Sequence, residues 1–134
     1  MIPRRPTQKQ SKTQGKAIDN KDEIDLDGWN LHRAAQENKV DIAGALIAHG
    51  NDVNAKNDTG YTPLSFAARE NSLEVAKLLI EHGADLDAKD EDGQTPLHHV
   101  AFQNSVDIAR LLIDSGSKVD AKANNGYTPL VYAA

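Results

Sequence analysis

The sequence predicts an all-α protein built from helix-turn-helix units that stack into a solenoid. Three observations lead to this fold class: residues recur every 33 positions, apolar residues follow helical spacing, and glycines recur at fixed places. Self-similarity with a period of this size is typical of repeat proteins. A unit of this length cannot bury its own apolar stripe, so neighbouring units must stack to make one continuous core.

The 33-residue period is carried by several residue types, which mark the same places in each unit. The recurring positions are Leu31, Leu64, Leu97 and Leu130; Ala35, Ala68, Ala101 and Ala134; Asn38, Asn71 and Asn104; Gly50, Gly83 and Gly116; and Gly60, Gly93 and Gly126. They define a repeat domain over 24–134, with units at about 24–56, 57–89, 90–122 and a truncated unit at 123–134.

The leader over 1–23 differs from the repeats in composition, being basic first and then acidic. Its basic residues are Arg4, Arg5, Lys9, Lys12 and Lys16, and all 20 acidic residues of the chain follow position 18. Because the leader has little apolar surface to bury, we expect it to be disordered. Its charges could contact phosphate, but it has no aromatic residue for base stacking and the repeat domain is acidic, so nucleic-acid binding is disfavoured.

The first helix of each later unit is expected to begin at a Thr-Pro pair. These pairs are Thr62-Pro63, Thr95-Pro96 and Thr128-Pro129. A threonine hydroxyl can accept from an N–H group of the first turn, and proline fits the first helical position. The first unit lacks the pair, but Asn30 can cap its helix. An asparagine at 38, 71 and 104 can adopt the left-handed conformation that ends a helix.

The second helix of each unit is predicted from an apolar stripe with steps of three, three and one. The stripes are Leu73, Ala76, Leu79 and Ile80, then Val106, Ala109, Leu112 and Ile113. This spacing belongs to a helix and not to a strand. Gly83 and Gly116 are expected to end these helices. The dipeptides that start at Asp92 and Asn125 are typical of tight hairpin turns.

These units resemble ankyrin repeats. The resemblance is carried by Thr62-Pro63-Leu64-Ser65-Phe66-Ala67-Ala68, Thr95-Pro96-Leu97-His98-His99-Val100-Ala101 and Leu78-Leu79-Ile80-Glu81-His82-Gly83-Ala84-Asp85, and it covers about 24–134. It implies an L-shaped solenoid with β-hairpin loops that project from one side. It also implies a role in protein–protein recognition, and a structural role for His32 and His98, which would bond across to neighbouring loops.

The resemblance further implies that a partner binds the hairpin tips and the exposed side of the first helices. Carried onto this sequence, the candidate residues are Lys56, Asp58, Thr59, Tyr61, Arg69, Glu70, Lys89, Glu91, Asp92, Gln94, Phe102, Gln103, Asn124, Asn125 and Tyr127. Tyr61, Phe102 and Tyr127 stand out, because aromatic residues are only 4% of the chain and tyrosine is enriched at binding hot spots. The alternative is that Tyr61 and Tyr127 pack over the neighbouring hairpin. The acidic hairpins favour a partner with a basic or mixed surface.

One asparagine is a candidate for modification. Leu46 precedes Asn54 by the spacing seen in ankyrin repeats that are hydroxylated on asparagine, so the resemblance implies Asn54 as the acceptor. The alternative interpretation, which we favour, is that Asn54 bonds the adjacent loop backbone.

Catalytic, metal and cofactor sites are not indicated by the sequence. The absence of cysteine excludes disulfides, thiolate zinc sites and a cysteine nucleophile. No phosphate loop, nucleophile elbow or zinc-protease motif is present. The acidic run from Asp85 to Asp92 includes Asp90 and is interpreted as a solvated hairpin. We therefore expect no enzyme activity, no cofactor and no small-molecule substrate.

The last unit stops within its first helix, which raises the question of how the end of the stack is covered. Leu112, Ile113, Leu130 and Val131 are expected to be partly exposed. Either the chain is a fragment of a longer repeat protein, or a partner or a second copy covers this end.

The resemblance implies two alternative function classes: an interaction module or scaffold, and a structural segment of a larger repeat protein, such as a bacterial effector delivered into host cells. No apolar run approaches the roughly 20 residues of a membrane span, and no secretory signal opens the chain. An intracellular location, cytoplasmic or nuclear, is expected.

Overall fold

The computed structural model describes residues 25–103 and 105–130, and the leader therefore lies outside the described residues. The helices are α1 (Leu31–Gln36), α2 (Val40–Ala48), α3 (Pro63–Glu70), α4 (Leu73–Glu81), α5 (Pro96–Gln103) and α6 (Val106–Asp114). No residue in these two ranges is in a β-strand. The predicted all-α class is confirmed.

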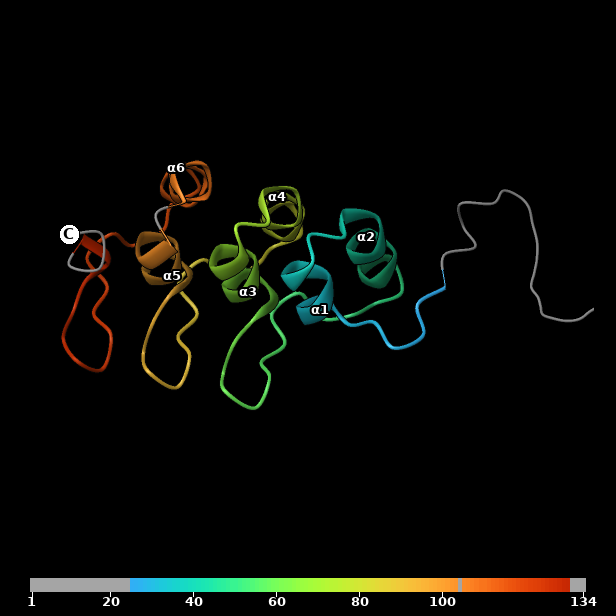
Figure 1. Cartoon of the computed structure of the whole chain (residues 1–134), viewed down its shortest axis with the longest axis horizontal. Helices are drawn as coiled ribbons and strands as arrows, with labels where there is room; N and C mark the ends of the chain where they lie inside the picture. Colours follow the sequence, from blue (N-terminus) through green and yellow to red (C-terminus); the bar gives the residue numbers. More distant parts are fainter. Residues whose placement is uncertain (1–24, 104, 131–134) are drawn as a thin grey trace, which may run out of the picture.

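The helices form two rows, with an inner row of α1, α3 and α5 and an outer row of α2, α4 and α6 (Figure 1). Within each unit the two helices contact each other, and along each row every helix contacts the next. The connections between units project as long loops on the side of the inner row (Figure 1). The result is the stacked solenoid that the 33-residue period predicts.

The predicted caps account for where α1 and α3 begin. Asn30 precedes α1 in an extended conformation, and its side-chain oxygen accepts from the backbone N–H of Arg33 at 2.8 Å. Thr62 does the same for α3, with its hydroxyl 3.2 Å from the N–H of Ser65. Each cap satisfies an N–H group that has no partner inside the helix.

The bends between paired helices depend on asparagines in the left-handed conformation. Asn38 and Asn71 have φ values of +54° and +59°. Asn38 also reaches the next unit, where its side-chain oxygen accepts from the N–H of Val75 at 3.4 Å and its amide donates to Glu74 at 3.2 Å. The predicted role of these two asparagines is confirmed, whereas Asn104 lies outside the described residues.

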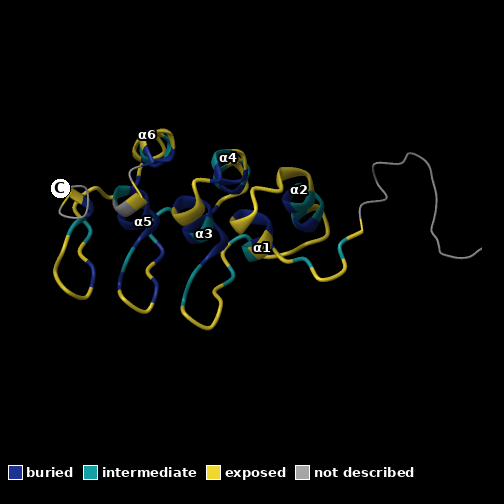
Figure 2. Cartoon of the chain, in the orientation of Figure 1, coloured by how far each residue is buried: buried dark blue, intermediate teal, exposed yellow. Residues whose placement is uncertain are grey.

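The core lies between the two rows and is almost entirely aliphatic, as the small aromatic content predicts. Helical faces that turn toward the other row are buried, whereas the loop tips are exposed (Figure 2). The core side chains are Leu31, Ala34, Ala35, Ala43, Leu46, Leu64, Ala67, Ala68, Val75, Ala76, Leu79, Ala84, Leu97, Val100, Ile108 and Leu112. They come from all six helices, except Ala84 in the loop after α4.

The three projecting loops share one backbone pattern. We name them hairpin 1 (56–61), hairpin 2 (89–94) and hairpin 3 (122–127). In each hairpin, an equivalent backbone hydrogen bond joins the two sides of the loop: Asn57 N–H to Tyr61 O at 2.9 Å, Asp90 N–H to Gln94 O at 3.0 Å and Ala123 N–H to Tyr127 O at 2.9 Å. Gly93 and Gly126 each donate to the residue three positions earlier, so both predicted tight turns are confirmed.

One expectation about the end of the stack is wrong. Leu112, which was expected to be partly exposed, is fully buried because it belongs to the core between the rows. Ile113 and Leu130 are exposed to 49% and 76%, as expected, and Val131 lies outside the described residues.

Candidate partner-binding surface

The hairpins are joined to one another by their lysines. Lys56 donates from its ammonium group to the carbonyl oxygen of Lys89 at 3.0 Å, and Lys89 donates to that of Lys122 at 3.2 Å. We call this chain of contacts, together with the backbone contacts described next, the hairpin ladder. Sequence reasoning proposed Lys56 and Lys89 for partner contact and missed this structural role.

Backbone and amide groups complete the hairpin ladder. Glu91 donates its N–H to the carbonyl of Thr59 at 3.2 Å. Asn124 donates its N–H to the carbonyl of Asp92 and its side-chain amide to that of Glu91, both at 2.8 Å. The hairpins are in close contact where Gly93 faces Asn124, since a Cβ atom on Gly93 would lie 2.8 Å from the Asn124 nitrogen. The tips are therefore held in a single row.

The candidate residues differ in how far they are exposed. The exposed ones are Lys56, Asp58, Thr59, Arg69, Glu70, Lys89, Glu91, Asp92, Gln103, Asn124, Asn125 and Tyr127, and the half-buried ones are Tyr61 and Gln94. Phe102 falls within α5, but its side chain is outside the described residues. The structure thus brings the hairpin set together along one edge of the stack and the helix set along the adjacent inner row (Figure 1).

Positive and negative charges are unevenly distributed along the row of hairpin tips. The ammonium groups of Lys56 and Lys89 are directed toward backbone oxygens of the next hairpin. The carboxylates of Glu91 and Asp92, next to each other in hairpin 2, are exposed, as is that of Asp58 in hairpin 1. Because hairpin 2 carries three carboxylates, on Asp90, Glu91 and Asp92, against the single ammonium group of Lys89, the centre of the row of tips is acidic.

The Tyr61 ring packs against the rings of Phe66 and His99, as the structural alternative for this residue predicts. Its ring centroid lies 5.1 Å from that of Phe66 and 5.1 Å from that of His99. The Arg69 guanidinium lies over the same ring at 5.8 Å. Burial, and then the Asp90 carboxylate, raises the pKa of the Tyr61 hydroxyl. Tyr61 therefore packs on its neighbours while keeping part of its surface open, whereas Tyr127 is 49% exposed.

The inner helices add charged side chains beside the tips. In α1, Arg33 lies 3.9 Å from the Trp29 ring centroid and 3.0 Å from the carboxylate of Glu37. In α3, Arg69 and Glu70 form a looser pair at 3.8 Å. Since each arginine lies over an aromatic ring, its planar head group is held in place on the exposed side of the helix.

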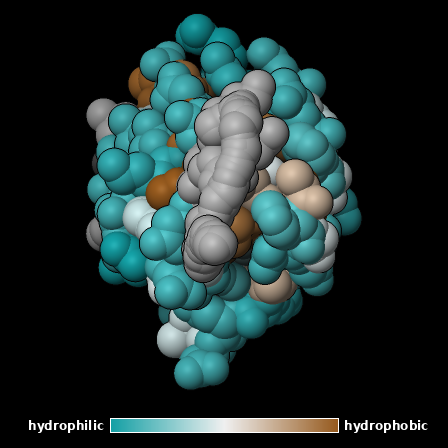
Figure 3. Space-filling view, turned by 90° about the vertical axis from the view of Figure 1, so that its right-hand side faces the viewer, coloured by the Kyte–Doolittle hydropathy of each residue, from teal (hydrophilic) through white to brown (hydrophobic). Residues whose placement is uncertain are grey.

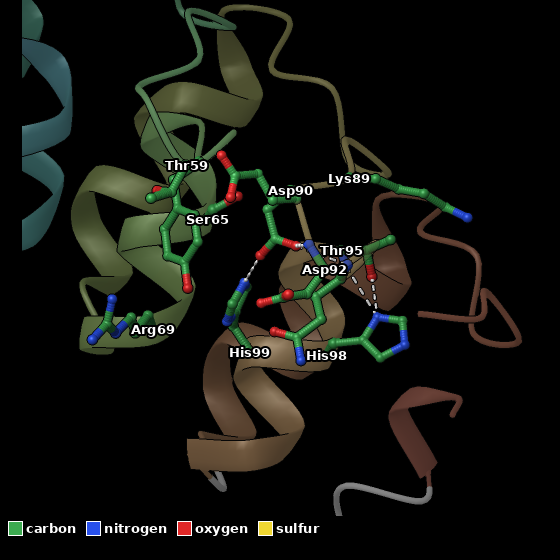
Figure 4. A network of polar contacts seen from close by, with 12 residues as sticks. Thr59, Ser65, Arg69, Lys89, Asp90, Asp92, Thr95, His98 and His99 are labelled. Carbon is green, nitrogen blue, oxygen red and sulfur yellow. Dashed lines mark hydrogen bonds and ion pairs between the residues drawn. The ribbon is translucent and has the colours of Figure 1, made fainter. Parts of the chain in front are cut away.

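A buried polar pair under hairpin 2 was missed by sequence reasoning. His99 Nε2 donates to the carboxylate of Asp90 at 3.0 Å, and both side chains are buried (Figure 4). The interpretation of this acidic run as a solvated hairpin is therefore wrong for Asp90. The other oxygen of the Asp90 carboxylate accepts from the N–H groups of Asp92 and Gln94, at 2.9 and 3.0 Å, and so stabilises the turn of hairpin 2.

The environment of His99 favours its neutral form. Burial lowers the pKa of the imidazole, and the hydrogen bond to Asp90 only partly opposes this effect. The sequence held one signal for this pair. Aligned by the 33-residue period, Asp90 replaces Asn57 and His99 replaces Phe66, so both positions become titratable in the same unit.

The predicted structural histidines are confirmed. His32 lies with Nε2 2.8 Å from the carbonyl of Tyr61, and His98 with Nε2 2.9 Å from that of Tyr127. The N–H of Thr95 donates to Nδ1 of His98 at 3.0 Å (Figure 4). Nε2 of His98 therefore carries the proton and donates to hairpin 3. His98 and His99 point to different hairpins, as expected for adjacent helical positions.

Asn54 bonds the next loop, as our favoured interpretation predicts. Its amide oxygen accepts from the N–H of Asp85 at 2.7 Å, and its amide nitrogen donates to the carbonyl of Gly83 at 3.3 Å. One unit later, Asp87 accepts from the N–H of Lys118 at 2.9 Å. Hydroxylation of Asn54 stays a prediction.

The two ends of the stack differ in character. At the end formed by α1 and α2, the surface that is not covered by grey atoms is mostly hydrophilic (Figure 3). At the other end, an apolar pocket of about 300 Å³ is lined mainly by Val106, Ala109, Ile113, Val119 and Leu130. Whether a second copy associates through this pocket stays a prediction.

Within the ranges 25–103 and 105–130, no group of histidine and acidic side chains is placed to hold a metal ion. None of the helices in this part is long and apolar enough to cross a membrane.

Comparisons with known proteins agree with the repeat pattern. Family models described as ankyrin repeats match residues 31–58, 46–100 and 84–134, and together they cover 31–134. No curated protein matches the chain. Ankyrin repeats are in general protein–protein interaction modules. The stacked helix pairs, the projecting hairpins and these matches together show that the chain belongs to the ankyrin-repeat family.

Proposed function

We propose that the chain is a non-catalytic interaction module whose protein partner binds the hairpin tips and the exposed side of the inner helices. The observation that carries this proposal is the hairpin ladder, which fixes the tips in one row and uses two lysines internally. A surface that is ordered before binding loses little conformational entropy when the partner arrives.

The charge distribution supports a partner with a basic or mixed surface. Glu91 and Asp92 place two exposed carboxylates at the centre of the row, with Asp58 on the preceding tip. Arg33 and Arg69 on the inner helices are each paired with a glutamate, Glu37 and Glu70, so this side presents both signs of charge. A partner segment with basic residues toward the tips and mixed or polar residues toward the helices would complement both.

Aromatic side chains supply the apolar part of the proposed surface. Tyr127 is half exposed, and Tyr61 keeps a partly open face beside Arg69. Rigid aromatic rings are common anchors of protein interfaces.

The experiment is a capture from cell lysate followed by affinity measurement with the purified partner. A Glu91→Gln, Asp92→Asn variant should bind about tenfold or more weakly than the native chain, because central charges at an interface contribute more than rim charges. The matched control is Glu81→Gln, Asp114→Asn, which removes two exposed carboxylates from the ends of outer helices. Equal loss of affinity in both variants would point to net charge alone, and unchanged affinity in the hairpin variant would contradict the proposal.

A further inference from the structure

Hairpins 1 and 2 are built on the same turn, but hairpin 2 holds it with titratable groups. In hairpin 1, the Asn57 oxygen accepts from the N–H groups of Thr59 and Tyr61, at 3.0 and 2.9 Å. In hairpin 2, Asp90 accepts in the same way from Asp92 and Gln94. The amide of one turn is thus replaced by a carboxylate in the next.

The second replacement lies on the helix under the turn. Phe66 of α3 packs against Tyr61 of hairpin 1, with ring centroids 5.1 Å apart. The corresponding residue of α5 is His99, which donates to Asp90 of hairpin 2 at 3.0 Å. A single buried carboxylate therefore ties the turn to the helix.

We propose that His99 and Asp90 position hairpin 2 on α5 and make this position respond to pH, so that acidification releases the turn. His99 acts here as a positioning residue, because it acts on the tip through Asp90. The consequence for partner binding rests on the proposed function, because Glu91 and Asp92 are carried by the released turn.

The physical reason lies in the groups that face the imidazole. These are Asp90 from hairpin 2, Tyr61 from hairpin 1, Arg69 from α3 and His98 from α5. The carboxylate favours a positive ring, whereas burial, the guanidinium and the second imidazole oppose it. Burial is the largest of these effects, so the closed arrangement binds a proton less readily than an open, hydrated one. By linkage, a fall in pH shifts the population toward the open arrangement.

Amide hydrogen exchange on the free protein tests this proposal, with hairpin 1 as an internal control. Protection factors are measured for the Asp92 and Gln94 amides and for their counterparts Thr59 and Tyr61, at about pH 7.5 and pH 5.5, which bracket histidine titration. On acidification, we expect the protection of the Asp92 and Gln94 amides in hairpin 2 to fall by roughly fivefold to tenfold, and that of the Thr59 and Tyr61 amides in hairpin 1 to change little. Equal change in both pairs would overturn the proposal.

A double variant separates titration from mere contact. Asp90→Asn with His99→Phe gives hairpin 2 and α5 the residues that the preceding unit has at the equivalent positions, Asn57 and Phe66. We expect its protection at Asp92 and Gln94 to be independent of pH in this range. A pH dependence equal to that of the native chain would overturn the proposal. Because no partner is present, this outcome is independent of whether the proposed binding function is correct, and the comparison of the two native hairpins stands if the variant does not fold.

Discussion

The ammonium group of Lys56 lies 3.0 Å from the carbonyl oxygen of Lys89, the residue that occupies the same position in the next unit. Lys89 repeats the contact with Lys122 at 3.2 Å. Lys56 and Lys89, which the sequence analysis assigned to partner contact, therefore hold neighbouring hairpins of the proposed surface together.

Replacing Lys89 by methionine removes the ammonium group while keeping the length of the side chain. We expect the free energy of unfolding to fall by about 0.5–1 kcal/mol, because the lost hydrogen bond is exposed to solvent. Lys122→Met is the matched control, since in the described part of the chain its ammonium group makes no hydrogen bond. Urea unfolding of both variants checks this, and a larger loss in the control would contradict it.

A methyl group at Gly93 should disturb the contact between hairpins 2 and 3. Gly93 has a φ of +74°, and the added Cβ would lie 2.8 Å from the nitrogen of Asn124. We expect Gly93→Ala to cost about 2–4 kcal/mol, from backbone strain of about 1–2 kcal/mol and from the steric contact. Gly126→Ala has similar strain at φ +83°, but no described atom lies within 4 Å of the new group. Thermal unfolding should therefore rank Gly126→Ala as the milder change.

His98 joins α5 to hairpin 3 from a fully buried position. His98→Ala removes the contacts with Thr95 and Tyr127 and leaves a cavity. We expect a loss of about 2–4 kcal/mol in the free energy of unfolding. His32→Ala deletes the equivalent contact with Tyr61 from a half-buried site and should cost less. The reverse order would show that burial does not govern the cost.

The Tyr61 hydroxyl should lose its proton at a higher pH than an ordinary tyrosine. Burial raises its pKa above the usual value of 10.0, and the Asp90 carboxylate adds to this effect. A raised pKa in the folded state contributes stability below pH 10.0 that is lost as the pH rises through the folded value. An ultraviolet titration of tyrosinate should lose its latest phase in Tyr61→Phe. If that phase remains, another tyrosine is responsible for it.

Asn54 offers a donor and an acceptor to the next loop, so its two roles can be separated. Asn54→Ala removes both contacts, with Gly83 and Asp85, and should cost about 1–2 kcal/mol. Asn54→Asp keeps the acceptor, as Asp87 does one unit later, and should cost less. The separate question of hydroxylation is checked by intact mass after expression in animal cells. A gain of one oxygen that disappears in Asn54→Ala would support it, and no gain would reject it.

The periodic features of the sequence predicted the fold because they depend on local physics. The caps at Asn30 and Thr62 and the left-handed bend at Asn71 each follow from one residue and its immediate neighbours. Leu112 was predicted wrongly, because the apolar stripe of α6 gives the buried side of the helix but not how far burial extends around it.

The candidate site was less predictable, because its main contacts join residues one unit apart. The contact of Asn54 with the adjacent loop was predicted as the alternative to its hydroxylation, but neither the reach of Lys56 to Lys89 nor the burial of Asp90 by His99 has a local signal. Only a comparison of equivalent positions, such as Asn57 with Asp90, could have drawn attention to the buried pair. Exposure of individual side chains depends on distances that a spacing rule does not contain.

The hairpin ladder also gives the chain a length scale. Each tip is bonded to the next through Lys56, Lys89 and Asn124, and each hairpin is carried by a stacked pair of helices. The distance between successive tips is therefore fixed. A binding segment that touches two tips must match this pitch with its own residues. On the proposed function, the row of hairpins would therefore select partner segments by the spacing of their residues as well as by their charge.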